Sequence, residues 1–224
     1  MKAFVAGATG ETGQCIVQEL VQRGIPVRAL VRNLEHGQKL LPLEAELAVG
    51  DVLQPQRLEE AMGDSTIAFS AIGARPSLDP SGPYQVDCRG NQNLIDTAWA
   101  KGIEHFVLVS SLCTSRLLHP LNLFWLVLHW KKRAEDYLQQ SGLTYTIVRP
   151  GGLRNQDAPD AIVMSPADTL TDGSIPRAKV AQTCVEAPFQ PAAANTIVEI
   201  VACQDAPAQQ WPQLFAQATG SALG

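Results

Sequence analysis

Three glycines at three-residue spacing, Gly7, Gly10 and Gly13, follow a short apolar run at the start of the chain, and an amphipathic segment comes directly after them. Strand, glycine turn and helix in this order form a dinucleotide-binding unit. Gly7 permits the tight turn off the strand, Gly10 lets backbone N–H groups approach a pyrophosphate, and Gly13 allows the helix to pack close to the strand. The helix N-terminus adds unpaired N–H groups and a partial positive charge. The residues that this turn predicts to bind the cofactor are Gly7, Thr9, Gly10, Glu11, Thr12 and Gly13.

The end of the second apolar run decides which nicotinamide cofactor fits. Sites for NAD place Asp or Glu there, to accept a hydrogen bond from the ribose 2′-hydroxyl. Here the run 27–31 ends in Arg32 and Asn33, with no acid at either position. A guanidinium binds a 2′-phosphate through two charge-assisted hydrogen bonds, whereas a carboxylate would repel it. Arg32 therefore predicts NADP(H), with Lys39 as a more distant positive charge; the alternative is a solvated surface arginine.

Two further apolar runs end in residues suited to the rest of a dinucleotide. Asp51 can accept a hydrogen bond from the adenine amino group, or it can be a turn or N-cap aspartate ahead of Pro55. Small residues after the fourth run leave space for the ribose and nicotinamide, and Gly73 gives backbone clearance. Arg75 could reach a substrate carboxylate or stack on a flat ring, or it could be an exposed loop arginine. The cofactor contacts predicted at these two strand ends are Asp51, Val52, Ala71, Ile72 and Gly73.

These residues meet only if the strands that carry them form one parallel sheet. Short runs rich in β-branched residues predict strands at 3–6, 27–31, 45–49, 66–70, 105–109 and 145–148. The stretches between them predict helices at about 12–23, 55–62, 86–101 and 122–140. Buried strands separated by helices form a parallel sheet with right-handed crossovers, and ligands bind at the carboxyl ends of its strands. The fifth and sixth strands add Ser110, Ser111, Pro150, Gly151 and Gly152 to the predicted site.

The pattern loosens after residue 150. We expect loops with a short strand at 161–164, then a helix at about 177–187 and a strand at 196–201, followed by a loosely attached helix in the tail. The whole chain, residues 1–224, is predicted to be one NAD(P)-binding domain of the α/β class. Its fold is expected to be a Rossmann-type doubly wound parallel sheet with a small C-terminal substrate cap at about 151–195.

The composition of the chain indicates its class of protein, its partners and its location. The chain has 224 residues, of which 46% are hydrophobic and 17% charged, which is typical of a globular protein. A net charge of −5 without a basic tail argues against a nucleic-acid partner. Five scattered cysteines with no C-x-x-C pair predict a reduced intracellular protein without a metal site. The longest apolar run is too short to span a bilayer, and the opening strand leaves no room for a leader. We expect the cytoplasm, or the plastid stroma in a plant.

Several motifs together resemble the atypical short-chain dehydrogenase/reductases, in particular plant and cyanobacterial NADP-binding proteins. They are Gly-Ala-Thr-Gly-Glu-Thr-Gly at 7–13, Leu-Val-Arg at 30–32, Gly-Asp-Val at 50–52, Val-Ser-Ser at 109–111 and Ser-Gly-Leu-Thr-Tyr-Thr-Ile-Val-Arg-Pro-Gly-Gly-Leu at 141–153. The resemblance covers roughly residues 1–203. A looser similarity to biliverdin-IXβ and flavin reductases includes Ser111 and the Gly-x-Arg at 73–75.

Catalysis in that family joins a serine to a Tyr-x-x-x-Lys pair, in which the tyrosine gives the proton and the lysine holds the nicotinamide ribose. The resemblance assigns the serine to Ser111 and the lysine to Lys131, with Lys132 as the neighbouring alternative or a solvated helix face for both. Val127 stands where the tyrosine belongs, and valine has no proton to give. A reductase of this sequence must take its proton from solvent, the substrate, His129 or Tyr84.

The apolar run 117–130, with Phe124, Trp125 and Trp130, allows three interpretations. It can be a core helix with spare apolar surface for a homodimer, a wall for a planar small-molecule substrate, or a membrane-surface contact. Three functions remain open. The first is an NADPH-dependent reductase of a small or planar acceptor such as flavin, quinone or a linear tetrapyrrole. The second is a non-catalytic NADPH-binding sensor or scaffold, and the third is an isomerase or epimerase, which the short cap disfavours.

Overall fold

One sheet of eight strands organises the chain, in the order β3-β2-β1-β4-β5-β6-β10-β8. The computed structural model describes residues 1–74, 79–123 and 125–220. The strands are β1 (Ala3–Ala6), β2 (Val27–Val31), β3 (Glu46–Val49), β4 (Ile67–Ser70), β5 (His105–Val109), β6 (Tyr145–Pro150), β8 (Ala161–Pro166) and β10 (Thr196–Cys203). Neighbouring strands pair in parallel except β8, which is antiparallel to β10. The predicted class, a Rossmann-type doubly wound α/β sheet, is confirmed.

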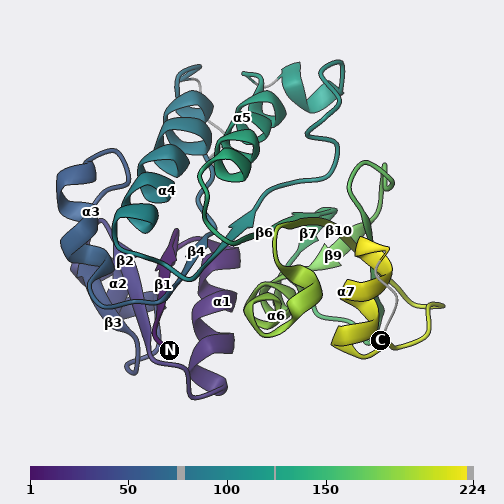
Figure 1. Ribbon diagram of the computed structural model, residues 1–224, viewed down its shortest axis with the longest axis horizontal. Helices are drawn as coiled ribbons and strands as arrows, with labels where there is room; N and C mark the ends of the chain where they lie inside the picture. Colours follow the sequence, from purple (N-terminus) through teal and green to yellow (C-terminus); the bar gives the residue numbers. More distant parts are fainter. Residues whose placement is uncertain (75–78, 124, 221–224) are drawn as a thin grey trace.

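Helices cover both faces of this sheet (Figure 1). The α-helices are α1 (Glu11–Gln22), α2 (Leu34–Leu40), α3 (Pro55–Met62), α4 (Asn91–Ala100), α5 (Val127–Gln140), α6 (Arg177–Glu186) and α7 (Trp211–Thr219). Helices α1 and α6 pack on one face, and α3, α4 and α5 on the other. A π-helical turn at Tyr84–Gly90 leads into α4, and short 3-10 helices lie at Pro120–Leu123, Ala187–Phe189 and Pro191–Ala193.

The first strand shows why the sheet has two cores. All four residues of β1 are buried, because helices cover both of its faces. Ala3 and Val5 face the core under α1 and α6, while Phe4 and Ala6 face the core under α3, α4 and α5. Alternation of side chains along a strand, combined with burial on both faces, produces the continuous apolar run seen in the sequence.

The strand order creates the crevice. Chain connections from β1 lead to β2 on one side, while β4 lies on the other side of β1. The loops after β1 and β4 therefore diverge at the carboxyl edge of the sheet, which is where doubly wound folds bind ligands.

Three helices differ from the prediction. Helix α2 was not expected; it begins because the Asn33 side chain accepts a hydrogen bond from the N–H of His36. The predicted helix 122–140 was too long at its start, because Trp125 and Leu126 have left-handed φ angles of 56° and 57° and α5 begins only at Val127. The expectation of a loosely attached tail helix was wrong: Phe215 in α7 is fully buried.

The segment after residue 150 is more ordered than the sequence indicated. It contains β8 and a separate two-stranded parallel sheet formed by β7 (Gly152–Arg154) and β9 (Ser174–Pro176). Gly173, with a φ of 114°, leads into β9, and its carbonyl accepts from the N–H of Gly152. Helix α6 matches the expected range. The role of this region as a substrate cap stays a prediction.

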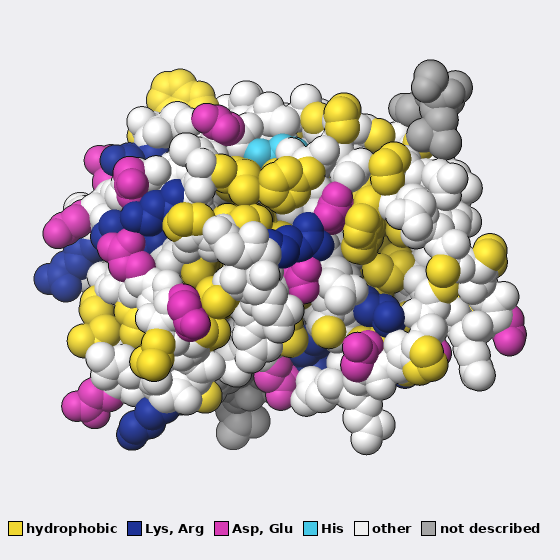
Figure 2. Space-filling model, turned by 90° about the horizontal axis from the view of Figure 1, so that it is seen from below, with side chains coloured by type: hydrophobic (Ala, Val, Ile, Leu, Met, Phe, Trp, Pro, Cys, Tyr) yellow, Lys and Arg dark blue, Asp and Glu magenta, His cyan; other side chains and the backbone are white. Residues whose placement is uncertain are grey.

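Charges of both signs are interspersed on the molecular face seen in Figure 2, without a single-sign patch. Among the helices of the described residues, none combines the length and hydrophobicity that crossing a bilayer requires.

His105 makes the stability of the folded chain depend on pH. Its ring lies buried at the start of β5, with Nε2 2.9 Å from the hydroxyl of Thr146, and burial lowers its pKa from 6.5 to about 4. The unfolded chain therefore binds a proton on this imidazole at a higher pH than the folded chain does. Stability must fall as the pH drops from about 6.5 towards 4, by about 2 kcal/mol at pH 5 from this group alone.

Urea unfolding of the wild type and of His105→Gln at pH 7 and pH 5 checks this expectation. Glutamine keeps a hydrogen-bonding group near Thr146 but does not titrate, so the variant should lose about 2 kcal/mol less than the wild type between the two pH values. Parallel losses in the two proteins would show that His105 is not the titrating group.

Candidate functional site

The glycine turn after β1 is shaped by backbone contacts that no side chain could share. Gly7 has a φ of 78°, and a Cβ on it would lie 2.6 Å from the carbonyl oxygen of Ala71 after β4. A Cβ on Gly13 would lie 2.1 Å from the carbonyl oxygen of Gly7, so the first turn of α1 rests directly on the loop. Gly10 is the N-cap of α1, and no side chain caps the helix. The N–H groups of the first turn are therefore left for an anion.

Glu11 would place a negative charge at this anion site. Its carboxylate contacts Arg177 of α6 at 2.9 Å and accepts a hydrogen bond from the side chain of Asn155 at 3.3 Å. The ion pair offsets the charge of Glu11 and joins the glycine turn to the segment after residue 150.

A cleft of about 350 Å³ extends from the glycine turn along the ends of β2, β3 and β4. It contains nine of the predicted site residues: Gly7, Thr9, Gly10, Arg32, Asp51, Val52, Ala71, Ile72 and Gly73. Leu30, Gly50, Leu53, Ala74, Gly82 and Val86 complete its lining. The glycine turn, the adjoining cleft and Arg32 in its lining are the parts that a dinucleotide site requires.

Arg32 is exposed where it lines the cleft. Within the described ranges, no carboxylate lies within 4 Å of its guanidinium, so no ion pair takes up its charge. Asp51 combines the two interpretations that the sequence left open. Its Oδ1 accepts a hydrogen bond from the N–H of Leu53 at 2.9 Å, as a turn aspartate does, and the residue also lines the cleft.

An ion pair lies beside Gly73, which lines the cleft, although neither residue of the pair lines it. The ammonium of Lys131 lies 2.8 Å from the carboxylate of Asp87, which is fully buried. A Cβ on Gly73 would lie 3.6 Å from Asp87 Oδ1 and 3.8 Å from Lys131 Nζ. Asp87 also accepts a hydrogen bond from the N–H of Ala74. Lys131 thus lies within reach of a group in the cleft, and Lys132 instead pairs with Asp136 on the same helix.

Sequence reasoning missed Asp87. Its signal is the spacing of Asp87, Asn91, Leu94 and Ile95, which places a carboxylate on the buried face of a helical stretch. A carboxylate on such a face requires a cationic partner, and the residue that provides it, Lys131, comes 44 residues later on α5.

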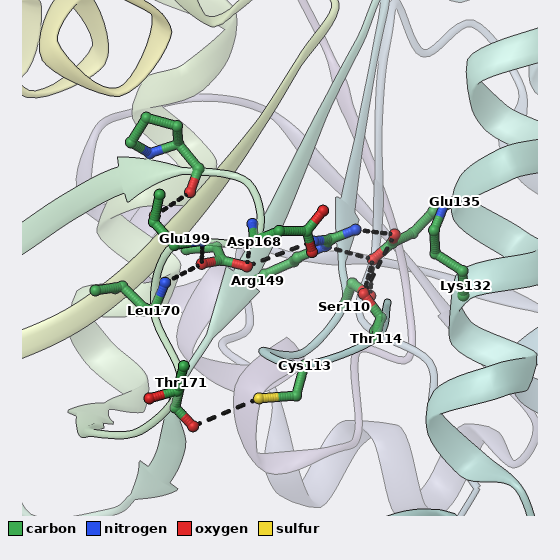
Figure 3. Close-up of polar contacts among 12 residues, drawn as sticks. Ser110, Cys113, Thr114, Lys132, Glu135, Arg149, Asp168, Leu170, Thr171 and Glu199 are labelled. Carbon is green, nitrogen blue, oxygen red and sulfur yellow. Dashed lines mark hydrogen bonds and ion pairs between the residues drawn. The ribbon is translucent and has the colours of Figure 1, made fainter. Parts of the chain in front are cut away.

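The side chain of Ser110 points towards Glu135, in a buried network of polar residues (Figure 3). Its hydroxyl donates to Glu135 Oε1 at 2.5 Å, and the hydroxyl of Thr114 donates to the same carboxylate. Arg149 of β6 holds Glu135 through two hydrogen bonds of 3.0 and 2.7 Å. Burial alone would lower the pKa of Arg149, but the hydrogen bonds and charge of Glu135 outweigh it and raise that pKa. The hydroxyl of Ser110 therefore belongs to this structural network.

Glu199 carries the network into the loop after β8. Its carboxylate accepts from the backbone N–H groups of Asp168, Thr169 and Leu170 at 2.9, 3.1 and 2.7 Å, and lies 3.4 Å from Arg149 (Figure 3). The fixed loop brings Leu170 against a small apolar cluster of Leu112, Cys113 and Leu128. Val127 packs on this same cluster, so the position expected of a tyrosine is apolar in its surroundings as well as in its side chain.

The remaining predicted residues do not line the cleft. Ser111 is partly buried after β5. Pro150 ends β6 as a partner of β10, and a Cβ on Gly151 would lie 2.6 Å from the carbonyl oxygen of Gly173. Gly152 begins β7. Arg75 lies outside the described residues. In the part of the chain that the structure describes, no group of three or more His, Cys, Asp or Glu side chains could hold a metal ion.

The strand order, the glycine turn and the cleft together define a Rossmann-type dinucleotide-binding protein, similar to the atypical short-chain dehydrogenase/reductases. Residues 7–191 match the family described as NAD(P)H-binding. The chain belongs to this family, as the sequence motifs indicated.

Its relatives include proteins of different roles. An uncharacterized chloroplastic protein of Arabidopsis thaliana is 43% identical over 98% of this chain and 83% of its own length. Sanguinarine reductase of Eschscholzia californica is 33% identical, with 84% of each protein covered. The chloroplastic protein TIC 62 of Oryza sativa subsp. japonica is 40% identical over 80% of this chain, which spans only 41% of that protein. Among solved structures, a putative NAD-dependent epimerase/dehydratase from Bacillus halodurans has a TM-score of 0.86 at 27% identity and covers 97% of this chain and 99% of its own.

Proposed function

We propose that this protein is an NADP(H)-dependent reductase that transfers hydride to a planar, conjugated small molecule such as a flavin, a quinone or a linear tetrapyrrole. The observation that carries the proposal is the cleft that extends from the glycine turn to Gly73, with the guanidinium of Arg32 in its lining and the Lys131–Asp87 pair beside Gly73. In this assignment the first turn of α1 binds the pyrophosphate, Arg32 binds the 2′-phosphate, and Lys131 binds the nicotinamide ribose.

The apolar surroundings of Val127 favour the conjugated class of acceptor. A simple carbonyl needs a proton donor at its oxygen as hydride arrives, and valine cannot supply one. A conjugated acceptor takes hydride directly and draws its proton from solvent. The relative named sanguinarine reductase supports a reductase activity. Location in the cytoplasm or the plastid stroma stays a prediction, and chloroplastic relatives are compatible with the latter.

A non-catalytic NADP(H)-binding sensor or scaffold is the second candidate. Val127 favours it for the same chemical reason, and the relative named TIC 62 is not named for a reaction. Oxidation of NADPH, offered separately with FMN, biliverdin and a soluble quinone, distinguishes the two. Turnover with any of them supports the reductase, whereas tight NADPH binding without turnover on all three supports the sensor.

Arg32→Ala tests the choice of cofactor. The variant loses two charge-assisted hydrogen bonds to the 2′-phosphate, each worth about 1.5 kcal/mol or more, so its affinity for NADPH should fall by roughly a hundredfold. Its affinity for NADH, which lacks that phosphate, should change by less than about threefold. Titration of nicotinamide fluorescence measures both. Lys39→Ala is the matched control, since Lys39 lies on α2 and does not line the cleft. An equal loss for NADPH and NADH would contradict the assignment of Arg32.

A further inference from the structure

The chain between β5 and α5 presents large apolar side chains to solvent. Figure 1 shows this segment as the loop and short helix at the upper right, beyond the first turn of α5. Its side chains are exposed by 62% at Leu117, 97% at Leu118, 44% at Leu121, 85% at Leu123, 45% at Trp125 and 43% at Leu126. We call these six residues the apolar lip. Soluble monomers rarely gather so many exposed apolar side chains in one place, so the apolar lip indicates an interaction surface.

The hydrogen bonds of one buried asparagine fix the conformation of the apolar lip. The amide nitrogen of Asn122 donates to the carbonyl oxygens of Arg116 and Leu117, and its amide oxygen accepts from the N–H groups of Leu128 and His129. One side chain thus ties the beginning of the segment to the beginning of α5. Leu118, Leu121 and Leu123 lie between these anchors, and their side chains are exposed.

The backbone of the apolar lip is strained, and the surrounding structure must offset the free energy of that strain. Trp125 and Leu126 are consecutive bulky residues in the left-handed region, with φ angles of 56° and 57°. Non-glycine residues adopt this conformation only where the surrounding structure imposes it, and it recurs at functional positions. Here it keeps Trp125 and Leu126 half exposed beside the leucines.

The charge of the segment is opposite to that of the whole chain. Residues 110–134 contain Arg116, Lys131, Lys132 and Arg133 and no Asp or Glu, although the chain has a net charge of −5. Lys131 and Lys132 pair with Asp87 and Asp136. Arg116 and Arg133 are exposed, and among the described residues no carboxylate lies within 4 Å of either guanidinium. Arg116 therefore supplies a cation within the segment itself, and Arg133 supplies a second one further along α5.

We propose that the apolar lip docks this protein on the surface of a bilayer that contains anionic lipids. The side chains of Leu118 and Leu123 are almost fully exposed, so they protrude into solvent, and a protein partner would need a matching groove. Acyl chains accept leucines of any arrangement, tryptophan favours the interface, and arginine binds anionic headgroups. This inference stands without the proposed function. If both hold, the apolar lip places α5 next to the bilayer, which is the source of a lipophilic acceptor. On α5, the ring of Trp130 packs edge-on against that of Tyr84, with 4.9 Å between the ring centroids.

Sedimentation with vesicles tests the proposal. The purified protein is mixed with vesicles of equal parts phosphatidylglycerol and phosphatidylcholine, or of phosphatidylcholine alone. We expect binding to the anionic vesicles that weakens at high salt. Leu118→Ser with Leu123→Ser should lower the partition coefficient at least tenfold, because the apolar area that enters the bilayer is lost. Arg116→Gln with Arg133→Gln should lower it roughly fivefold per arginine on anionic vesicles.

Leu43→Ser is the matched control, because Leu43 is also 97% exposed but lies between α2 and β3. It should bind vesicles as the wild type does, and all variants should keep the wild-type melting temperature and NADPH affinity. A wild type that stays in the supernatant with anionic vesicles would overturn the proposal, as would equal binding by the leucine double variant. Light scattering supplies the remaining outcome: a wild-type dimer that becomes a monomer in that double variant would assign the surface to a second copy of the chain.

Discussion

Gly13→Ala is expected to cost the protein about 3 kcal/mol of stability and at least tenfold in dinucleotide affinity. The new Cβ would lie 2.1 Å from the carbonyl oxygen of Gly7, and that oxygen is fixed because it accepts the N–H of Gly10 at 2.9 Å. The clash is with backbone at a tight turn, so no side-chain rotation relieves it, and α1 must move away from the loop. Moving α1 also moves the N–H groups that are proposed to bind the pyrophosphate.

Thermal unfolding with and without NADPH measures both effects. About 3 kcal/mol corresponds to a fall of roughly 6–12 °C in Tm for a chain of this size, and the shift caused by NADPH should shrink as well. Gly152→Ala is the matched control, because its nearest contact would be an ordinary 3.5 Å and its φ is not in the left-handed region. If Gly13→Ala melted and bound NADPH like Gly152→Ala, the close packing of α1 on the glycine turn would be refuted.

Arg149→Met is expected to destabilise the protein by about 3–5 kcal/mol. Methionine fills similar space, but it leaves the carboxylates of Glu135 and Glu199 fully buried without their shared cation. Arg154→Met removes an arginine from a pair with Asp160 that is partly exposed, and should cost less than about 1 kcal/mol.

Urea unfolding at pH 7 measures the loss. Adding Glu135→Gln and Glu199→Gln to Arg149→Met removes the buried negative charges and should restore part of the stability. A triple variant less stable than the wild type by the sum of the three single losses would show that uncompensated charge is not the cause.

The sequence predicted those parts of the fold that depend on local patterns. Six strands were predicted close to their observed bounds because helices cover both faces of the sheet and impose continuous apolar runs. The glycine turn was predictable because Gly10 and Gly13 pack against Gly7, only a few residues earlier. Gly7 itself packs against the loop after β4, which has a fixed place in this fold. The parallel arrangement of the strands followed from the helices between them.

Contacts between distant segments could not be predicted in the same way. Ser110 looked like a site residue by its place after β5, but its hydroxyl bonds to Glu135, which is 25 residues away. The start of α5 depends on Asn122, whose side chain accepts from N–H groups six and seven residues later, a spacing outside the usual capping patterns. The tail helix seemed weakly attached because only its packing against β8 and β10 reveals that Phe215 is core.

The assembly of the cleft from loops after β1, β2, β3 and β4 has a consequence for the life of the protein in a cell. A nucleotide that binds there needs all four loops in place, so it binds the folded chain and shifts the folding equilibrium towards that state. At a hundred times its dissociation constant, a ligand adds about 2.7 kcal/mol to a folded state, which is a large share of the stability of most domains. The abundance of this protein should therefore follow the size of the nucleotide pool, with the empty chain degraded first.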